Sequence, residues 1–258
     1  MNNILIKVEN LVKTFGGLVA LNDCSLEIKD KAITGIIGPN GSGKTTLFNV
    51  ITGNLKPDTG KVFYNGIEIT NEESHDLFHL GVLRTFQIAH EFSNMTVIEN
   101  LMVVPGNQKG EKLLYSLMNS QKIKKEDELI KDKAMEVLKF LKIEHLKNER
   151  AGNLSGGQKK LLELARTMMV DAKIVFLDEV GAGVNKTLLR DISDSILKLN
   201  QDKGYTFCMI EHDFNSISEL CDPVIVLAEG SVLFKGSAEE VKSNEQVIDS
   251  YLGKGLKK

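Results

Sequence analysis

A glycine-rich stretch near the N-terminus reads Gly38-Pro39-Asn40-Gly41-Ser42-Gly43-Lys44-Thr45-Thr46. It matches the pattern G-x-x-x-x-G-K-[ST], it follows the apolar run Ile33–Ile37, and we expect a helix to begin over Thr45–Thr52. A strand, this loop and a helix in that order distinguish a phosphate-binding loop from a chance glycine-rich turn. The stretch therefore predicts a nucleotide-binding α/β domain built around it.

The residue types in this loop are those that phosphate binding needs. Gly41 and Gly43 leave room for backbone N–H groups to approach phosphate oxygens, and the following helix directs its N-terminal donors at the same anion. Lys44 supplies a cation for the β- and γ-phosphates, and the Thr45 hydroxyl can bind Mg²⁺. We therefore expect the chain to bind ATP with Mg²⁺ through residues 38–46.

Two adjacent carboxylates, Asp178 and Glu179, follow the apolar run Ile174–Leu177, which is predicted to be a strand. Parallel sheets place ligand-binding groups at the carboxyl ends of their strands. Because side chains alternate along a strand, one carboxylate can hold Mg²⁺ while the other polarises the attacking water. An acidic pair after a strand is on its own more typical of a capping turn. Beside a phosphate loop, we interpret Asp178 as a metal ligand and Glu179 as the catalytic base.

The composition is that of an ordinary globular protein. The chain has 258 residues, 42% of them hydrophobic, and a net charge of −3, so its charge gives no reason to expect nucleic-acid binding. It has no run of 18 uncharged apolar residues, and its first residues do not resemble a secretion signal. Three widely spaced cysteines favour a location in the reducing cytoplasm. Because the sequence predicts no membrane-spanning segment, the protein would need a partner to work at a membrane.

The order of predicted elements indicates an α/β fold. Asn65-Gly66 lies between two short β-like runs and predicts a hairpin, hence an antiparallel part. Strands and helices alternate after residue 170, which is typical of a mostly parallel sheet. We predict a RecA-like P-loop NTPase core over 1–86 and 154–236, including an antiparallel β subdomain. A helical subdomain is predicted at 87–153 and a C-terminal tail at 237–258, all within one ATP-binding domain.

A second glycine-rich motif, Leu154-Ser155-Gly156-Gly157-Gln158, opens a predicted amphipathic helix at Gly157–Met169. With the phosphate loop, Asp178-Glu179 and His212, it makes the whole chain resemble the ATP-binding subunit of the ABC transporter family. This resemblance implies a transport-coupled ATP hydrolase that dimerises on ATP. Ser155, Gly156, Gly157 and Gln158 would dock on the γ-phosphate held by a second subunit, either the same or a related chain. Further partners would be integral membrane permeases that hold the protein at the inner face of the cell membrane.

The resemblance also assigns roles to single residues. Phe15 matches the aromatic residue that stacks on adenine, with a strand-end core position as the alternative interpretation. Gln87 matches the glutamine that binds Mg²⁺ and senses the membrane partner, and His212 matches the histidine that holds the γ-phosphate beside the base Glu179. The loop Ala182–Asn185 matches the segment that couples the two composite sites.

Several stretches are similar to those of the importer ATPases for branched-chain amino acids: Gly16–Leu21, Arg84–Gln87, Met95–Leu101, Glu211–Asp213 and Val247–Gly253. The ATPases of urea importers and lipopolysaccharide exporters are similar alternatives, and a soluble ABC ATPase outside transport is another. Val180 and Lys186 depart from the pattern, because proline is usual at both positions. The transported substrate and the direction of transport remain open at this point, since the substrate contacts lie in other subunits.

Overall fold

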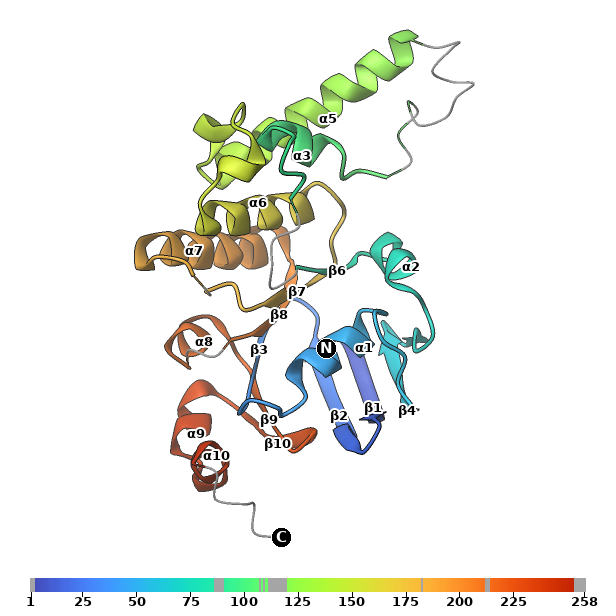
Figure 1. The fold of residues 1–258 in the computed structure, drawn as a ribbon, viewed down its shortest axis with the longest axis vertical. Helices are drawn as coiled ribbons and strands as arrows, with labels where there is room; N and C mark the ends of the chain where they lie inside the picture. The colour runs from blue at the N-terminus through green and yellow to red at the C-terminus, as the bar shows by residue number, and fades with distance from the viewer. Residues whose placement is uncertain are drawn as a thin grey trace. The chain divides into compact units, whose positions relative to one another are not determined.

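The computed structural model describes residues 3–85, 91–106, 108, 110, 120–181, 183–211 and 214–252 (Figure 1). The chain forms two compact units, each assembled from separate segments. The first contains Met1–Arg84, Lys173–Val180 and Leu197–Lys258, and the second contains Thr85–Ala172 and Gly181–Ile196.

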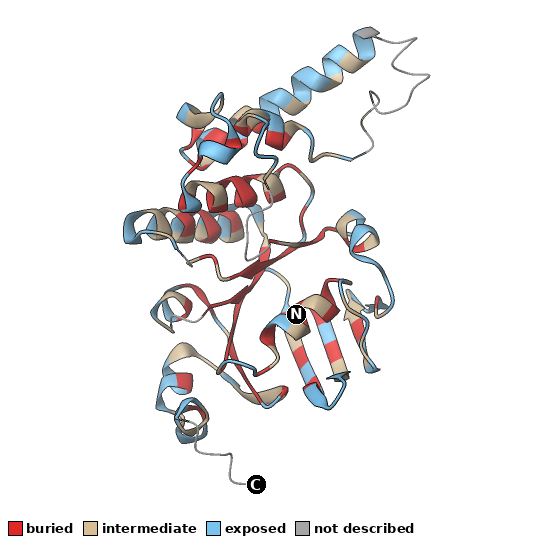
Figure 2. Ribbon diagram, in the orientation of Figure 1, coloured by how far each residue is buried: buried red, intermediate tan, exposed pale blue. Residues whose placement is uncertain are grey.

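A six-stranded sheet forms the centre of the first unit, with the order β10-β9-β3-β8-β7-β6. Its strands are β3 (Ile33–Ile37), β6 (Val82–Arg84), β7 (Ile174–Asp178), β8 (Thr206–Ile210), β9 (Val224–Ala228) and β10 (Ser231–Gly236). Only β10 pairs antiparallel among these described strands. Every residue of β3, β7, β8 and β9 is buried (Figure 2), which explains why these strands are continuous apolar runs. The predicted mostly parallel sheet is confirmed.

An antiparallel sheet of order β2-β1-β4-β5 forms the other layer of this unit. It contains β1 (Ile4–Phe15), β2 (Leu18–Lys29), β4 (Thr59–Tyr64) and β5 (Ile67–Glu68). The turn between β4 and β5 has positive φ at Asn65 (47°) and Gly66 (81°), as the predicted hairpin requires. Strands β1 and β2 are longer than their apolar cores suggest, because register shifts interrupt the alternation of buried and exposed residues.

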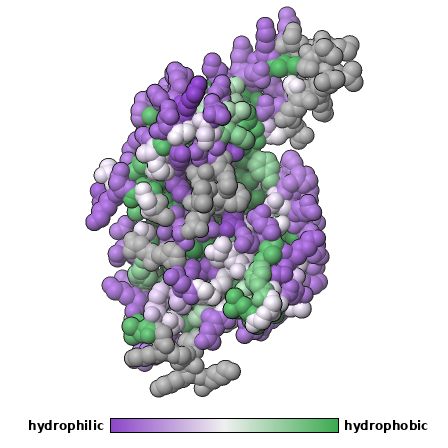
Figure 3. All heavy atoms as spheres, viewed as in Figure 1, coloured by the Kyte–Doolittle hydropathy of each residue, from purple (hydrophilic) through white to green (hydrophobic). Residues whose placement is uncertain are grey.

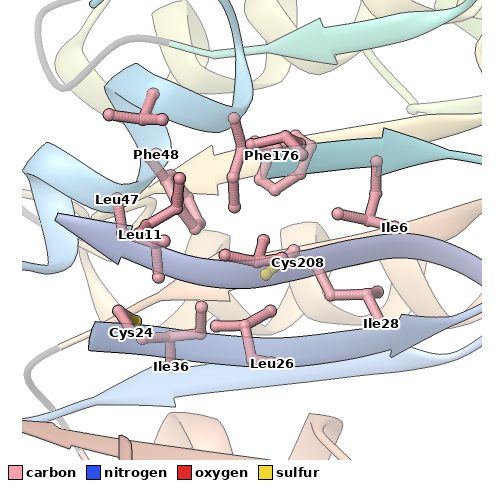
Figure 4. Packing of buried hydrophobic residues seen from close by; sticks show 14 of the residues in the cluster. Ile6, Leu11, Cys24, Leu26, Ile28, Ile36, Leu47, Phe48, Phe176 and Cys208 are labelled. Atoms are coloured by element: carbon pink, nitrogen blue, oxygen red, sulfur yellow. The ribbon is translucent and has the colours of Figure 1, made fainter. Parts of the chain in front are cut away.

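The core of the first unit lies between these two sheets. Helix α1 (Lys44–Ile51) contributes Leu47 and Phe48, and the ring of Phe48 meets that of Phe176 edge-on with centroids 5.0 Å apart. Figure 4 shows β1 and β2 side chains facing those of the parallel sheet and of α1. The phosphate-loop helix is thus fixed by its apolar face to both sheets.

The second unit is helical. Its elements are α3 (Val97–Met102), α5 (Ser120–Phe140), the short 3₁₀ turns Glu144–Leu146 and Ala151–Asn153, α6 (Gly156–Met168) and the first part of α7 (Lys186–Lys203). Helix α5 is amphipathic, and its apolar residues Ala134, Val137 and Leu138 are buried. Its other side chains are mainly hydrophilic, as Figure 3 shows, which agrees with a solvated face.

Four short helices complete the first unit: α2 (Ser74–His79), α8 (Phe214–Leu220), α9 (Ala238–Ser243) and α10 (Glu245–Tyr251). Helices α9 and α10 lie within 237–258, the segment for which the sequence predicts a C-terminal tail. Within the described ranges, none of the helices combines the length and the apolar character needed to cross a bilayer.

Candidate nucleotide-binding site

The phosphate loop joins the end of β3 to the start of α1, as the sequence predicts. Gly43 is the N-cap of α1 and has a φ of 98°, and a Cβ atom there would lie 2.4 Å from the backbone oxygen of Ala20. No side chain fits at this point, because both the left-handed conformation and the nearby backbone exclude it. The second glycine of the motif is therefore required by the path of the chain.

A pocket of about 320 Å³ opens over this loop, and all of its lining residues belong to the first unit. The phosphate loop lines it from Asn40 to Thr46, Phe15, Leu18 and Ala20 line it from the β1–β2 hairpin, and Glu179 completes it. The structure thus brings together three groups that are far apart in the sequence: an aromatic ring, a glycine-rich loop and a carboxylate.

Lys44 lies beneath this pocket with only 6% of its surface exposed. Its Nζ donates hydrogen bonds to the backbone oxygens of Gly38 (2.9 Å) and Pro39 (3.0 Å). Burial lowers the pKa of the ammonium group, and the carboxylates of Glu179 and Asp178 oppose that shift. The acidic pair therefore lies within electrostatic reach of the phosphate-loop cation.

Asp178 and Glu179 have different surroundings. Asp178 is the last residue of β7 and is buried, whereas Glu179 is half-buried and faces the pocket. Glu179 has a φ of 49°, and its N–H donates to the oxygen of Ile210 over 2.9 Å. Strand β7 ends at Asp178 and the chain turns at Glu179, so alternation along a strand, the predicted reason for their different roles, does not extend to Glu179. Positive φ at a residue other than glycine is uncommon, and such strain gathers at functional sites.

Arg84 is a site residue that residue-level reasoning missed. Its Nη2 donates to Asp178 Oδ2 over 2.8 Å, and both side chains are buried, with exposures of 8% and 5%. Its Nη1 donates to Asn49 Oδ1 on α1. The available signal was a charged residue at the end of the apolar run Val82-Leu83, since a buried arginine needs a partner.

Phe15 lies at the end of β1 with 49% of its surface exposed. It is therefore not a core residue, and its ring faces the pocket. Asp58 holds the two residues that precede Phe15 in place. Its carboxylate accepts hydrogen bonds from Lys13 Nζ (2.8 Å), Thr14 N (2.7 Å) and Thr14 Oγ1 (2.7 Å). These bonds lower the pKa of Asp58 to about 2, and the hydrogen bond from Lys13 contributes most to the shift.

The second glycine-rich motif opens α6, one residue earlier than predicted. Ser155 caps this helix: its Oγ accepts from Gln158 N (3.4 Å), and its N–H donates to Gln158 Oε1 (2.9 Å). Gly156 is exposed, whereas Gly157 is buried against Leu188. The motif thus presents an exposed helix N-terminus on the second unit.

Three residues with predicted roles, Gln87, His212 and Ala182, lie outside the described residues. Their roles stay predictions from the family resemblance.

A phosphate loop between a parallel strand and a helix, with an acidic pair at the end of another strand of the same sheet, defines a P-loop NTPase. Comparison with known proteins narrows this class. The sequence model of the family described as "ABC transporter" matches residues 21–182. The chain belongs to this family and is one of its ATP-binding, ATP-hydrolysing cassettes, as its motifs predict.

Two similar relatives are LivG proteins. The Archaeoglobus fulgidus protein named "Probable branched-chain amino acid transport ATP-binding protein LivG" is 43% identical over 249 residues, covering 96% of this chain and 95% of the relative. The Escherichia coli K12 protein named "High-affinity branched-chain amino acid transport ATP-binding protein LivG" is 34% identical over 253 residues, with coverages of 98% and 99%.

Solved structures of ATP-binding cassettes are also similar. The ADP conformation of the cassette MJ1267 superposes with a TM-score of 0.82 at 40% identity, covering 97% of this chain and 99% of that chain. The dimeric, post-hydrolysis cassette MJ0796 bound to ADP and Pi gives a TM-score of 0.75 at 25% identity, with coverages of 91% and 99%.

Proposed function

We propose that this chain is the ATPase subunit of an importer of branched-chain amino acids and that it works as a dimer on membrane permeases. The observation that carries the ATPase site is the pocket shared by Phe15, the phosphate loop and Glu179. The names of the relatives, which match over nearly the whole chain, support the substrate class. A dimeric cassette among the similar structures supports the assembly.

ATP binds along this pocket with its adenine on Phe15 and its phosphates in the loop. The exposed ring of Phe15 offers a flat surface for stacking. The backbone N–H groups after Gly38 and the N-terminus of α1 bind the phosphate oxygens. The ammonium of Lys44 is held by two backbone carbonyls, and it exchanges them for the more strongly attracting β- and γ-phosphate oxygens.

The oxygen donors beside this loop suit Mg²⁺. Thr45 lies in the first turn of α1 and lines the pocket, and Asp178 ends β7 within electrostatic reach of Lys44. Hydroxyl, carboxylate and amide oxygens are the ligands that this hard cation prefers, so Thr45, Asp178 and Gln87 would hold it. When bound, the ion neutralises charge on the β- and γ-phosphates.

Glu179 acts as the general base in hydrolysis. It is the carboxylate that lines the pocket, whereas Asp178 is engaged by Arg84. From the wall of the pocket, its carboxylate can orient a water molecule toward the γ-phosphate. His212 would hold the γ-phosphate, as the family resemblance implies.

The site is completed by a second subunit. Ser155, Gly156, Gly157 and Gln158 of the partner dock on the γ-phosphate through the exposed N-terminus of α6, a natural anion-binding terminus. Closure of the dimer on ATP drives permease subunits, which hold the protein at the inner face of the membrane.

Single substitutions test the ATPase site. Glu179→Gln keeps the shape of the base but removes its basicity, so ATP should stay bound and trap a dimer while turnover falls by about 10²–10⁴-fold. Lys44→Ala should abolish ATP binding. Glu68→Gln, on the exposed strand β5 outside the pocket, is the matched control and should hydrolyse ATP normally. Hydrolysis by Glu179→Gln at the normal rate would disprove the role of this residue.

The substrate and the partners need a test in cells. The protein should co-purify with the permeases encoded beside it, and uptake of radiolabelled leucine should require both the permeases and an intact Glu179. Uptake of urea in place of leucine would contradict the substrate assignment while leaving the ATPase site intact.

A further inference from the structure

The guanidinium of Arg84 joins two parts of the site that come from distant segments. It donates hydrogen bonds to Asp178 Oδ2 at the end of β7 (2.8 Å) and to Asn49 Oδ1 in the last turn of α1. Because α1 is the helix that begins at Lys44, one side chain connects the acidic strand end to the phosphate-loop helix.

The surroundings of Arg84 leave this side chain little freedom. Its guanidinium carbon lies 5.8 Å from the centroid of the Phe48 ring, which is itself fully buried against Phe176. Strand β6, which ends at Arg84, pairs in parallel with β7 up to Phe176. A planar cation held on an aromatic face, with donors directed at two fixed acceptors, is a rigid support.

Arg84 bonds one particular oxygen of the Asp178 carboxylate, Oδ2. The same carboxylate is the proposed metal ligand. A guanidinium on one oxygen orients the plane of the carboxylate and directs the other oxygen. A residue that hydrogen-bonds a metal-ligating side chain orients that side chain and thereby changes the affinity of the site for the ion.

We propose that Arg84 is a positioning residue that holds the Asp178 carboxylate for the metal and ties its position to that of α1 through Asn49. The proposal rests on the metal-binding role of Asp178 proposed above. Arg84 is not itself a metal ligand and need not touch ATP. Its effect is therefore on metal affinity and not on the binding of ATP without metal.

Metal binding in a non-hydrolysing background tests this role. In a Glu179→Gln protein saturated with ATP, Mn²⁺ affinity is measured by electron paramagnetic resonance, and ATP affinity is measured separately in EDTA. Arg84→Met should weaken Mn²⁺ binding by about 10–100-fold and leave the metal-free ATP affinity unchanged. Arg84→Lys keeps the charge but lacks the rigid planar fork of donors, so it should weaken Mn²⁺ binding to an intermediate degree. Asn49→Ala removes only the hydrogen bond between Arg84 and α1, so it should weaken Mn²⁺ binding less than Arg84→Met does.

Stability is separated from positioning by a control in the same sheet. Phe207→Leu, in the fully buried strand β8, should lower the melting temperature with no change in Mn²⁺ affinity. Unchanged or tighter Mn²⁺ binding by Arg84→Met would overturn the proposal, since the guanidinium would then be merely structural or would compete with the ion. If Arg84→Met does not fold, unchanged affinity in both Arg84→Lys and Asn49→Ala overturns it equally.

Asp178→Asn distinguishes failure of this inference from failure of the proposed site. This variant should weaken Mn²⁺ binding more than any change at Arg84. If Asp178→Asn binds the ion normally, the metal assignment of the proposed function is wrong, and the inference is wrong with it. If Asp178→Asn loses the ion and the Arg84 variants do not, only the inference is wrong.

Discussion

Replacing Gly157 with alanine should destabilise the helical unit, although alanine is the better helix former. Gly157 is the second residue of α6, and a Cβ atom there would lie 2.2 Å from Leu188 Cδ2 and 3.1 Å from Val184 Cγ1. Carbon atoms in favourable contact are about 3.5–4.0 Å apart. The added methyl group therefore forces either Leu188 into another rotamer or α6 away from the start of α7.

The expected loss follows from two opposing terms. Overpacking of this kind costs about 1–3 kcal/mol, and the helix propensity of alanine offsets up to about 1 kcal/mol. With the full offset, the net loss in the free energy of unfolding is at most about 2 kcal/mol, with a central value of about 1 kcal/mol. In a chain of this length, a loss of about 1 kcal/mol lowers the melting temperature by roughly 2–4 °C.

Thermal unfolding followed by circular dichroism measures this loss, and Gly156→Ala is the matched control. A Cβ atom at Gly156 meets only the backbone oxygen of Gly183, at 3.7 Å, so this variant should keep its melting temperature while losing ATP-dependent dimerisation. Adding Leu188→Ala to Gly157→Ala removes the clash, so the two changes together should cost less than their sum. Equal melting temperatures for Gly157→Ala and the unsubstituted protein would refute this reasoning.

Three further changes have defined outcomes. Lys186→Pro should raise the free energy of unfolding by about 0.4–1 kcal/mol in urea titrations, because Lys186 is the first residue of α7, where proline suits the helix; a loss would contradict this. Asp58→Ala frees the strand end that carries Phe15 and should weaken ATP binding in calorimetry, with unchanged turnover at saturating ATP. Burial raises the pKa of the Cys24 thiol from 9.0 to about 12, so its contribution to stability should be full below pH 9 and be lost toward pH 12. Labelling of Cys24 by a thiol reagent at pH 8 should accordingly require denaturant.

The central strands were predictable because they are buried on both faces. Ile174–Asp178 and Thr206–Ile210 are apolar runs that no amphipathic helix would show. The phosphate loop and the cap at Ser155 were equally predictable, because a short backbone motif defines each. The full length of strand β1 was not predictable, since its bulges, one of them at Asn10 with positive φ, break the alternation that marks a strand.

The site was predictable only in part. Asp178 and Glu179 could be placed at the end of a strand, but their different surroundings depend on the turn at Glu179 and on Arg84. The partner of a buried charge is not encoded near it: Arg84 and Asp178 are 94 positions apart. No local pattern in a single sequence reveals such a pair.

The sequence alone determined the identity and the position of the phosphate loop. Its glycines, lysine and threonine act through the local backbone, which nine consecutive residues are enough to specify. Tertiary structure decided what surrounds that loop: the exposed ring of Phe15, the half-buried base Glu179, and the guanidinium that joins Asp178 to α1. These relations depend on strand order and packing between distant segments, because burial and pairing arise only when those segments meet.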